Sequence, residues 1–286
     1  MDGLAHYVKS AGEKMIDFDI LRKKTLEFEF SVIVLTSYNK PTEKLDGAVD
    51  ECINHDLTRL MKEETIPGII ENAKNEKFEL IIIDNGSEKE HLDYLLSIPQ
   101  LHQPTRLVFN YVNLGVSGGW NQGLKIARGE YICIVSNDMI IKTPNYLRIL
   151  QKPMLEDFNV VSTGPEASDI GVECIGIGLK KLPYADYITV NCQMIRKEWL
   201  EEIGYLDEMC YPYMGEDTEF GIRAWKNNKK VMKVDLPSSF HWGQRSVQRY
   251  WSRPEINISW DRNRKYIKNK HKDFLEKRAK ENKEYR

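Results

Sequence analysis

Two adjacent acids, Glu216 and Asp217, stand among apolar and aromatic residues in the stretch CYPYMGEDTEFGIRAW, residues 210–225. The spacing of the residues that follow them predicts a helix. Acids are common at a helix N-terminus, because they accept hydrogen bonds from free amides and complement the helix dipole, so capping alone would account for the pair. A carboxyl group shielded by the neighbouring tyrosines and Phe220 would also have a raised pKa, which suits a general base. The pair is therefore a candidate for proton transfer, and the charge of one acid would raise the pKa of the other further.

A further carboxylate, Asp138, stands in the run VSNDM, where a predicted strand ends beside Ser136 and Asn137. Mg²⁺ and Mn²⁺ prefer oxygen ligands and often share one or two carboxylates with substrate phosphates. An Asp in a turn can equally cap the local backbone. His241, after the last predicted strand, offers an imidazole that Mn²⁺ accepts, although a lone His beside Trp242 is more often a packed or surface residue.

Polar residues gather where three predicted strands end, and ligands of open α/β sheets bind beyond these ends. Turn chemistry explains any one of these residues, but their recurrence in three strands favours a pocket. A carboxylate at Asp84 could accept hydrogen bonds from a ribose or a base. The residues are Thr36, Ser37, Tyr38 and Asn39 after the first strand, Asp84 and Asn85 after the second, and Asp138 after the fourth.

The segment NLGVSGGWNQGLKIARG is predicted to be a glycine-rich loop that leads into a helix. Its glycines at 115, 118, 119 and 123 would allow a ligand to approach the backbone, but they would also allow tight packing of a helix. The spacing matches neither a dinucleotide fingerprint nor a phosphate P-loop.

The segments around these residues indicate an α/β fold. Near-continuous apolar strands alternate with helical stretches, which is typical of a mostly parallel central sheet with helices on both faces. The strands are FEFSVIVLTSYN, FELIIID, TRLVFNYV and EYICIVSND, and the second half adds a helix that ends near Gly204 and the strand KVMKVDLP. We expect residues 1–28 to form a helical extension, residues 29–250 the main domain, and residues 251–286 a basic helical tail.

The composition limits the class of protein. The chain has 286 residues, a formal net charge of −2, 41% hydrophobic residues and five cysteines without a C-x-x-C pair. These values favour a globular protein of a reducing compartment rather than a general polyanion binder. No apolar run reaches the roughly 20 residues of a membrane span, and no secretory signal is visible. We expect a soluble cytoplasmic protein, and attachment of its basic tail to the inner membrane surface is the alternative to a solvated helix.

The order of these motifs resembles the family 2 glycosyltransferases, nucleotide-sugar-dependent enzymes with the GT-A fold. The resemblance covers roughly residues 29–250, and six ordered matches make it specific. The aspartate motif is similar to that of the rhamnosyl- and galactosyltransferase-like branch. The matching stretches are VIVLTSYNK, IIIDNGS, NLGVSGGWNQGLKIARGEYICIVSND, MIRKEWLEEIGYLDE, GEDTEFGIRAW and FHWGQRS.

The resemblance implies a role for each matching residue. Asp217, with Glu216, would supply the catalytic base of an inverting transfer, and Asp138 and His241 would hold Mn²⁺ or Mg²⁺ against the diphosphate. Ser136 occupies the first position of the D-x-D motif, where a hydroxyl cannot supply the missing charge, so metal affinity is expected to be weaker. The nucleotide and donor site would comprise Thr36, Tyr38, Asn39, Asp84, Asn85, Asn113, Gly115, Trp120, Asn121 and Asn137.

The expected partners are a UDP- or dTDP-sugar as donor and a glycan, lipid-linked sugar or protein as acceptor. The stretch QRSVQRYWSRP and the basic tail mix aromatic and basic residues, so a nucleic-acid acceptor is a minority alternative. A nucleotidyltransferase is a further alternative, although LTSYNKPTEK lacks its glycine-rich loop. A non-catalytic sugar- or nucleotide-binding protein on the same fold also stays open, because a fold alone does not establish activity.

Overall fold

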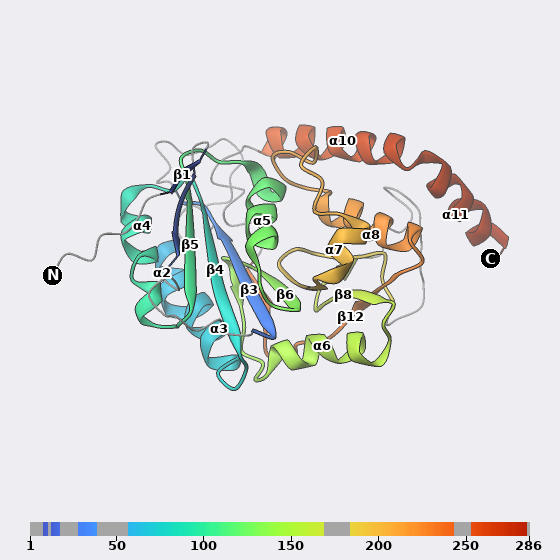
Figure 1. Cartoon of the computed structure of the whole chain (residues 1–286). Coiled ribbons are helices and arrows are strands. Elements are labelled where there is room, and N and C mark those ends of the chain that lie inside the picture. The colour runs from blue at the N-terminus through green and yellow to red at the C-terminus, as the bar shows by residue number, and fades with distance from the viewer. Residues whose placement is uncertain are drawn as a thin grey trace.

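A computed structural model describes residues 8–10, 13–17, 28–38, 57–168, 184–242 and 253–284. Its centre is a nine-stranded sheet with the strand order β1-β2-β5-β4-β3-β6-β11-β8-β12 (Figure 1). The strands are β1 Val8–Ser10, β2 Glu13–Asp17, β3 Phe30–Thr36, β4 Phe78–Asn85, β5 Thr105–Asn110, β6 Tyr131–Ser136, β8 Val160–Gly164, β11 Cys192–Arg196 and β12 Lys230–Lys233.

Strands β5, β4, β3 and β6 are mutually parallel, so the predicted mostly parallel sheet is confirmed. Strand β11 runs antiparallel between β6 and β8. The helical prediction for residues 1–28 is wrong for the part that the structure describes, because β1 and β2 are strands and β2 pairs with β5. The mixed composition of this stretch fits the pattern of an edge hairpin as well as that of an amphipathic helix.

Helices cover both faces of the sheet, because the apolar strands bury alternate residues on opposite sides. Val32 and Val34 of β3 belong to one hydrophobic cluster, and Ile33 belongs to the other. The first cluster includes residues of α3 and α6, and the second includes residues of α5, α7 and α8. The helices are α2 Leu57–Leu60, the π-helical turn Met61–Thr65, α3 Ile66–Asn72, α4 Lys89–Leu95, the 3₁₀ turn Ile98–Gln100, α5 Gly115–Ile126, α6 Tyr146–Glu156, α7 Glu198–Ile203 and α8 Glu216–Lys226.

Two short strand pairs lie beside the main sheet. Strand β7, Met139–Ile140, pairs with β13, Phe240–His241, and β9, Ala167–Ser168, pairs with β10, Tyr187–Ile188. In the first pair His241 lies opposite Met139. This register brings the imidazole beside Asp138, about a hundred residues earlier in the chain.

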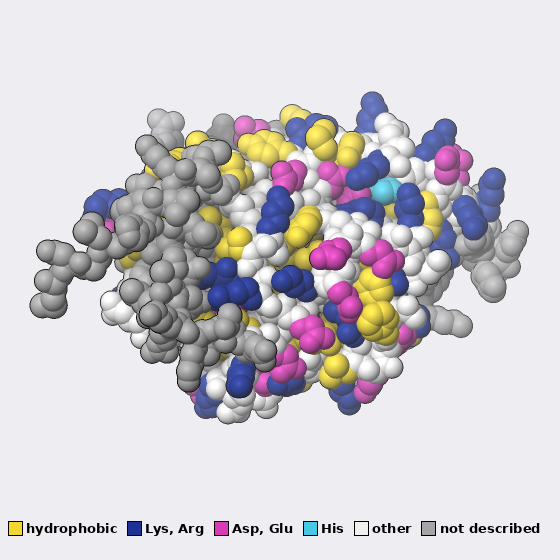
Figure 2. Space-filling view, viewed as in Figure 1, with side chains coloured by type: hydrophobic (Ala, Val, Ile, Leu, Met, Phe, Trp, Pro, Cys, Tyr) yellow, Lys and Arg dark blue, Asp and Glu magenta, His cyan; other side chains and the backbone are white. Residues whose placement is uncertain are grey.

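The C-terminal segment forms α10, Arg253–Lys270, and α11, Lys272–Glu284. Figure 2 shows Lys and Arg side chains gathered over α11 and the end of α10. A face of α10 is nevertheless buried: Asn263 and Ile267 have no exposed surface. The prediction of a simple solvated tail is therefore wrong for α10, which packs against the main domain. No helix among the described residues has the length and apolar character needed to cross a bilayer.

Candidate active site

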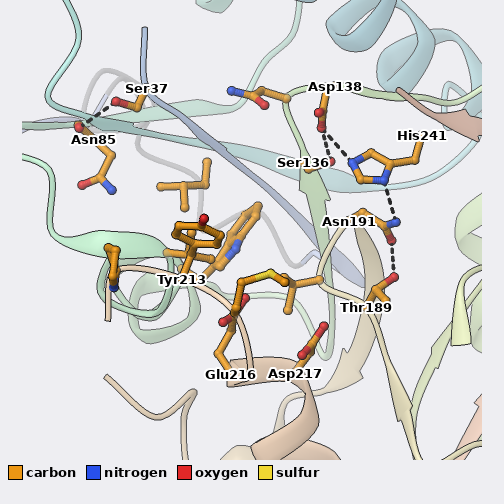
Figure 3. Close-up of a pocket in the computed structure, with 18 of the residues that line it drawn as sticks. Ser37, Asn85, Ser136, Asp138, Thr189, Asn191, Tyr213, Glu216, Asp217 and His241 are labelled. Atoms are coloured by element: carbon orange, nitrogen blue, oxygen red, sulfur yellow. Dashed lines mark hydrogen bonds and ion pairs between the residues drawn. The ribbon is translucent and has the colours of Figure 1, made fainter. Parts of the chain in front are cut away.

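A cavity of about 590 Å³ opens where β3, β4 and β6 end and α8 begins. Figure 3 shows Asp138 and His241 on one side of it and Glu216 and Asp217 on another, with their side chains directed into the same space. The cavity thus brings together the predicted acid pair and the predicted metal ligands. Other predicted residues that line it are Thr36, Asn85, Asn113, Trp120 and Asn137.

The polar wall of the cavity follows from the parallel register of the strands. Thr36, the last residue of β3, receives a hydrogen bond from Nδ2 of Asn137 at 3.1 Å, and its Oγ1 lies 2.9 Å from Nε2 of the buried His91. Asn85 ends β4, and its Nδ2 donates to Oδ1 of Asn113 at 3.0 Å. These bonds fix the amides that face the cavity, so the wall is preorganised for a polar ligand.

Four predicted residues lie outside the cavity lining, and Asn39 falls outside the described residues. Asp84 accepts a hydrogen bond from the amide of Ser87 at 3.1 Å, and burial raises the pKa of its carboxyl group. Asn121 binds the backbone of Leu206, to whose carbonyl its Nδ2 donates at 2.8 Å. The remaining two are Tyr38 and Gly115.

The side chain of Asn121 is bound to the protein backbone at both of its polar ends. Its Oδ1 accepts the Leu206 amide at 3.0 Å, so both ends of the side chain hold the loop that precedes the acid pair. The glycine-rich segment is also different from its prediction, since α5 begins at Gly115 and includes all four glycines. A Cβ atom on Gly119 or Gly123 would collide with Leu35 or Ile33 of β3. These two glycines therefore permit tight packing of the helix on the sheet.

Asp138 and His241 form the candidate metal-binding pair. Oδ1 of Asp138 accepts a hydrogen bond from Oγ of Ser136 at 2.8 Å and lies 3.1 Å from Nε2 of His241. Burial lowers the pKa of His241, but the carboxylates of Asp138 and Glu166 outweigh it and raise the value to about 10. In this arrangement the imidazole is cationic and neutralises the buried Asp138.

The other side of the His241 ring is held by residues that the sequence did not indicate. Asn191 places its Nδ2 3.1 Å from Nδ1 of His241, and it also contacts Glu166. The hydroxyl of Thr189 donates to Oδ1 of Asn191 at 2.7 Å. Glu166, Thr189 and Asn191 all line the cavity. They lie in irregular segments without a local motif, so only the tertiary structure identifies them.

The donor set of this pair fits a divalent cation that completes its coordination with substrate. It comprises a carboxylate oxygen, an imidazole nitrogen that can act as a ligand once the cation displaces its proton, and an adjacent hydroxyl. Among the described residues, no group of three or more His, Cys, Asp or Glu side chains could hold a metal ion. Mn²⁺ and Mg²⁺ sites often use one or two protein ligands together with phosphate oxygens, so two suffice here.

The acid pair is aimed into the cavity by the backbone turn that starts α8. Met214 and Gly215 have positive φ angles of 76° and 97°, and Gly215 is the residue before the helix. Burial and the neighbouring Asp217 raise the pKa of Glu216 to about 8. Burial also raises the pKa of Asp217, to about 6, despite the hydrogen bond that its Oδ1 accepts from the Thr218 amide at 2.6 Å. Near neutral pH the pair therefore carries about one negative charge, mainly on Asp217.

Helix α10 holds the turn in place from behind. Nδ2 of the fully buried Asn263 donates to the carbonyls of Tyr213 at 3.0 Å and Met214 at 2.9 Å. Lys270 and His271 contact Glu219 at 2.7 and 2.9 Å. The sequence predicted a helix after the acid pair, but it did not indicate these contacts from the C-terminal segment.

The charge of the cavity is one-sided. Among the described residues that line it are four acids, Asp138, Glu166, Glu216 and Asp217, and His241 is the one that can carry a positive charge. No described Lys or Arg side chain lines the cavity. Within the described lining, His241 is therefore the side chain that could neutralise part of the charge of a phosphate group.

Comparison with known proteins shows what this chain is similar to. Residues 33–174 match the family model described as Glycosyl transferase family 2. A curated relative from Haloferax volcanii, the low-salt glycan biosynthesis hexosyltransferase Agl10, is 24% identical over 186 residues. The alignment covers 57% of this chain and 58% of the relative, so the chain spans little more than half of that protein.

Two solved structures share the fold. The structure of GalNAc-T7 with UDP, GalNAc and Mn²⁺ matches with a TM-score of 0.55 and 16% identity, over 75% of this chain and 43% of that one. The mannosyltransferase PcManGT from Pyrobaculum calidifontis, in complex with GDP-Man and Mn²⁺, matches with a TM-score of 0.53 and 16% identity, over 75% of this chain and 59% of that one. The chain has a GT-A fold, and the family match together with the hexosyltransferase relative supports a glycosyltransferase of family 2.

Proposed function

We propose that the protein transfers a sugar from a nucleoside diphosphate sugar to an acceptor hydroxyl, with inversion at the anomeric carbon. The observation that carries this proposal is the arrangement of the cavity, in which Asp138 and His241 face the Glu216–Asp217 pair across one space (Figure 3). A site of this kind can hold the leaving diphosphate on one side of a sugar and a base on the other.

In the proposed step, Asp217 takes the proton of the acceptor hydroxyl. The acceptor oxygen forms a bond to the anomeric carbon from the face opposite the diphosphate. The bond from that carbon to the phosphate oxygen breaks, and its electron pair leaves with the nucleoside diphosphate.

Asp217 suits the role of the base, because its side chain is only partly buried and its pKa of about 6 leaves it mostly ionised at neutral pH. Glu216, with a pKa of about 8, is mostly protonated there.

Asp138 and His241 are the residues that would hold a divalent cation, Mn²⁺ or Mg²⁺. When bound, the cation would neutralise the charge that develops on the departing diphosphate. The lining supports this role, since no described Lys or Arg could take it over. Ser136 adds orientation rather than charge, because its hydroxyl donates to Asp138 at 2.8 Å. Both structural neighbours were solved with Mn²⁺.

The donor belongs to the nucleotide sugars, and its nucleotide would occupy the wall formed by Thr36, Asn85 and Asn137. The neighbours were solved with UDP and with GDP-Man. We keep a UDP- or dTDP-hexose as the proposed donor and the rhamnosyl- and galactosyltransferase-like branch as the proposed group. The relative named a hexosyltransferase is consistent with a six-carbon sugar.

The test is a screen of nucleotide sugars for release of nucleoside diphosphate, followed by the Asp217→Asn variant. We expect the variant to lower turnover by about 10²- to 10⁴-fold, the usual contribution of a general base, with nucleotide binding nearly unchanged by calorimetry. Asp235→Asn is the matched control, because the Asp235 side chain is 79% exposed and lies outside the cavity lining.

Unchanged turnover of the Asp217→Asn variant would remove the base assignment. If no nucleotide sugar releases its diphosphate but nucleotides still bind, the transferase proposal fails. The alternative of a non-catalytic binding protein then holds.

A further inference from the structure

Trp260 of α10 forms part of the cavity wall, although it lies outside the segment that matches the family model. Its neighbours in the lining include Gly215, Glu216 and Asp217. A Cβ atom placed on Gly215 would lie 3.5 Å from Cζ3 of the indole, so the ring packs directly beside the turn that starts α8. The side chain is only partly buried, which leaves part of the ring accessible from the cavity.

The indole has a fixed position because the helix behind it is anchored. Asn263 and Ile267, three and seven residues further along α10, are fully buried on the same side of the helix. Asn263 donates to the carbonyls of Tyr213 and Met214, the residues just before Gly215. Trp260 and the acid pair are thus held together by one set of contacts, as a preorganised binding surface requires.

The lining near the acid pair is aromatic and apolar. Tyr213 and Met214 directly precede the turn, and Tyr187 lies against Gly221, one helical turn after Asp217. The wall at the strand ends is polar instead, with Thr36, Asn85, Asn113 and Asn137. The two walls would suit different ligand groups: the polar one a nucleotide, and the aromatic one a flat ring with an apolar face.

The charged side chains of the cavity lining also bear on which class of acceptor fits. No Lys or Arg lines the cavity among the residues that the structure describes, so none of them could neutralise a phosphate at the reacting end of an acceptor. An uncharged sugar ring needs no such neutralisation. It presents an apolar C–H face to an aromatic ring and hydroxyl groups at its edge, and pockets for such ligands combine aromatic side chains with a few polar groups.

We infer that Trp260 binds the acceptor and that the acceptor is an uncharged sugar ring, one hydroxyl of which is directed at Asp217. This inference rests on the proposed transferase function and names the acceptor class for the same cavity. Of the acceptors expected from the sequence, it selects a glycan or the sugar of a glycosylated carrier over a bare protein hydroxyl, a lipid phosphate or a nucleic acid.

The experiment measures transfer by the full chain from the donor found in the nucleotide-sugar screen. The acceptor probes are a panel of methyl hexopyranosides, farnesyl phosphate and a serine-containing peptide. We expect transfer to at least one methyl glycoside. Trp260→Ala should raise the KM for that glycoside by about tenfold or more, the equivalent of one lost ring contact, and Trp260→Phe should restore most of the affinity. The Kd for the nucleoside diphosphate should stay the same in both variants.

Ile258→Ala is the matched control, because Ile258 lies on the same helix, is 69% exposed and is outside the cavity lining. Equal acceptor KM values for Trp260→Ala and the wild type would overturn the role of Trp260. Transfer to farnesyl phosphate or the peptide, but to no glycoside, would overturn the acceptor class while the transferase function stands. Failure of every donor in the screen would instead remove the transferase function, and the inference with it.

Discussion

At the scale of single residues, Glu216 and Glu219 on the first turn of α8 have pKa values shifted in opposite directions, because their surroundings differ. Burial would raise the pKa of Glu219, but hydrogen bonds and charges from His271, Arg223 and Lys270 lower it to about 2. Among the described residues no basic side chain pairs with Glu216, and burial raises its pKa to about 8. The ion-paired acid is therefore anchored in its charged form, whereas the acid that faces the cavity can exchange a proton near neutral pH.

The raised pKa of Glu216 predicts a pH-dependent stability. Its folded value of about 8 exceeds the usual 4.5, so the folded state binds the extra proton. Its contribution to the free energy of unfolding is therefore complete below about pH 4.5 and is lost as the pH rises to about 8. Urea unfolding should show that the wild type loses about 4 kcal/mol more than Glu216→Gln between pH 5 and pH 8.5.

The matched control for this measurement is Glu201→Gln, on the exposed side of α7. It should follow the wild type at both pH values. If Glu216→Gln loses as much stability as the wild type over this interval, Glu216 does not hold its proton in the folded protein.

The sequence indicated some residues of the site and missed others for a physical reason. Asp138, Glu216, Asp217 and His241 line the cavity, and the sequence indicated them through their places in a series of ordered motifs, because an acid at a strand end or a helix start is by itself common. Asn121 lies outside the cavity lining, and an amide that ties two backbone segments together has the same sequence signature as one that binds a ligand. The residues that no motif indicated are Glu166, Asn191, Trp260 and Asn263, which reach the site through contacts distant in the chain.

At the scale of elements, the cavity depends on α10. The composition of this segment predicted only a charged, solvated tail. From Arg262 onward the chain has eleven Lys or Arg residues and four acids, which favoured a solvated helix. The structure instead buries Asn263 and Ile267 of α10 against the turn that starts α8. A helix with few buried positions gives a weak periodic signal, so its docking could not be read from the sequence.

The docking contact predicts a positioning role for Asn263. Asn263→Ala removes the donor to the Tyr213 and Met214 carbonyls and leaves buried acceptors unpaired, which should lower the free energy of unfolding by about 1–3 kcal/mol. Because the turn carries Glu216 and Asp217, turnover should fall as well, while the Kd of the nucleoside diphosphate should change little. Steady-state kinetics and calorimetry on the same preparation separate the two effects.

Asn227→Ala is the matched control for this variant. Nδ2 of Asn227 also donates to a backbone carbonyl, that of Arg223 at 2.8 Å, but Asn227 is exposed, so water can replace the lost bond. Its stability should fall less and its turnover should stay at the wild-type level. Equal turnover in the Asn263→Ala variant and the wild type would show that α10 stabilises the fold without positioning the acid pair.

At the scale of the whole molecule, the net charge of −2 conceals an uneven distribution. The basic residues of α10 and α11 lie mainly on the surface (Figure 2), whereas the described cavity lining has four acids and no Lys or Arg. The parallel core was predictable, because near-continuous apolar strands fit only a sheet that is covered on both faces. The charge of the cavity was not, because it depends on which side chains from separate segments point inward.

This distribution predicts that a nucleoside diphosphate binds weakly without a divalent cation. Two phosphates brought beside Asp138 and Glu166 would meet like charges, and His241 is already paired with both carboxylates. Calorimetry should show that Mn²⁺ strengthens UDP binding by about tenfold or more over binding in EDTA, since a cation must offset repulsion of this size. Asp138→Asn should lose most of this gain. Asp157 is a surface acid paired with Lys230, so Asp157→Asn should keep the gain.

Uridine is the internal control, because a ligand without phosphates should bind equally with and without the metal. Equal affinities for UDP in Mn²⁺ and in EDTA would show that the diphosphate draws its positive charge from side chains rather than from a cation at Asp138 and His241.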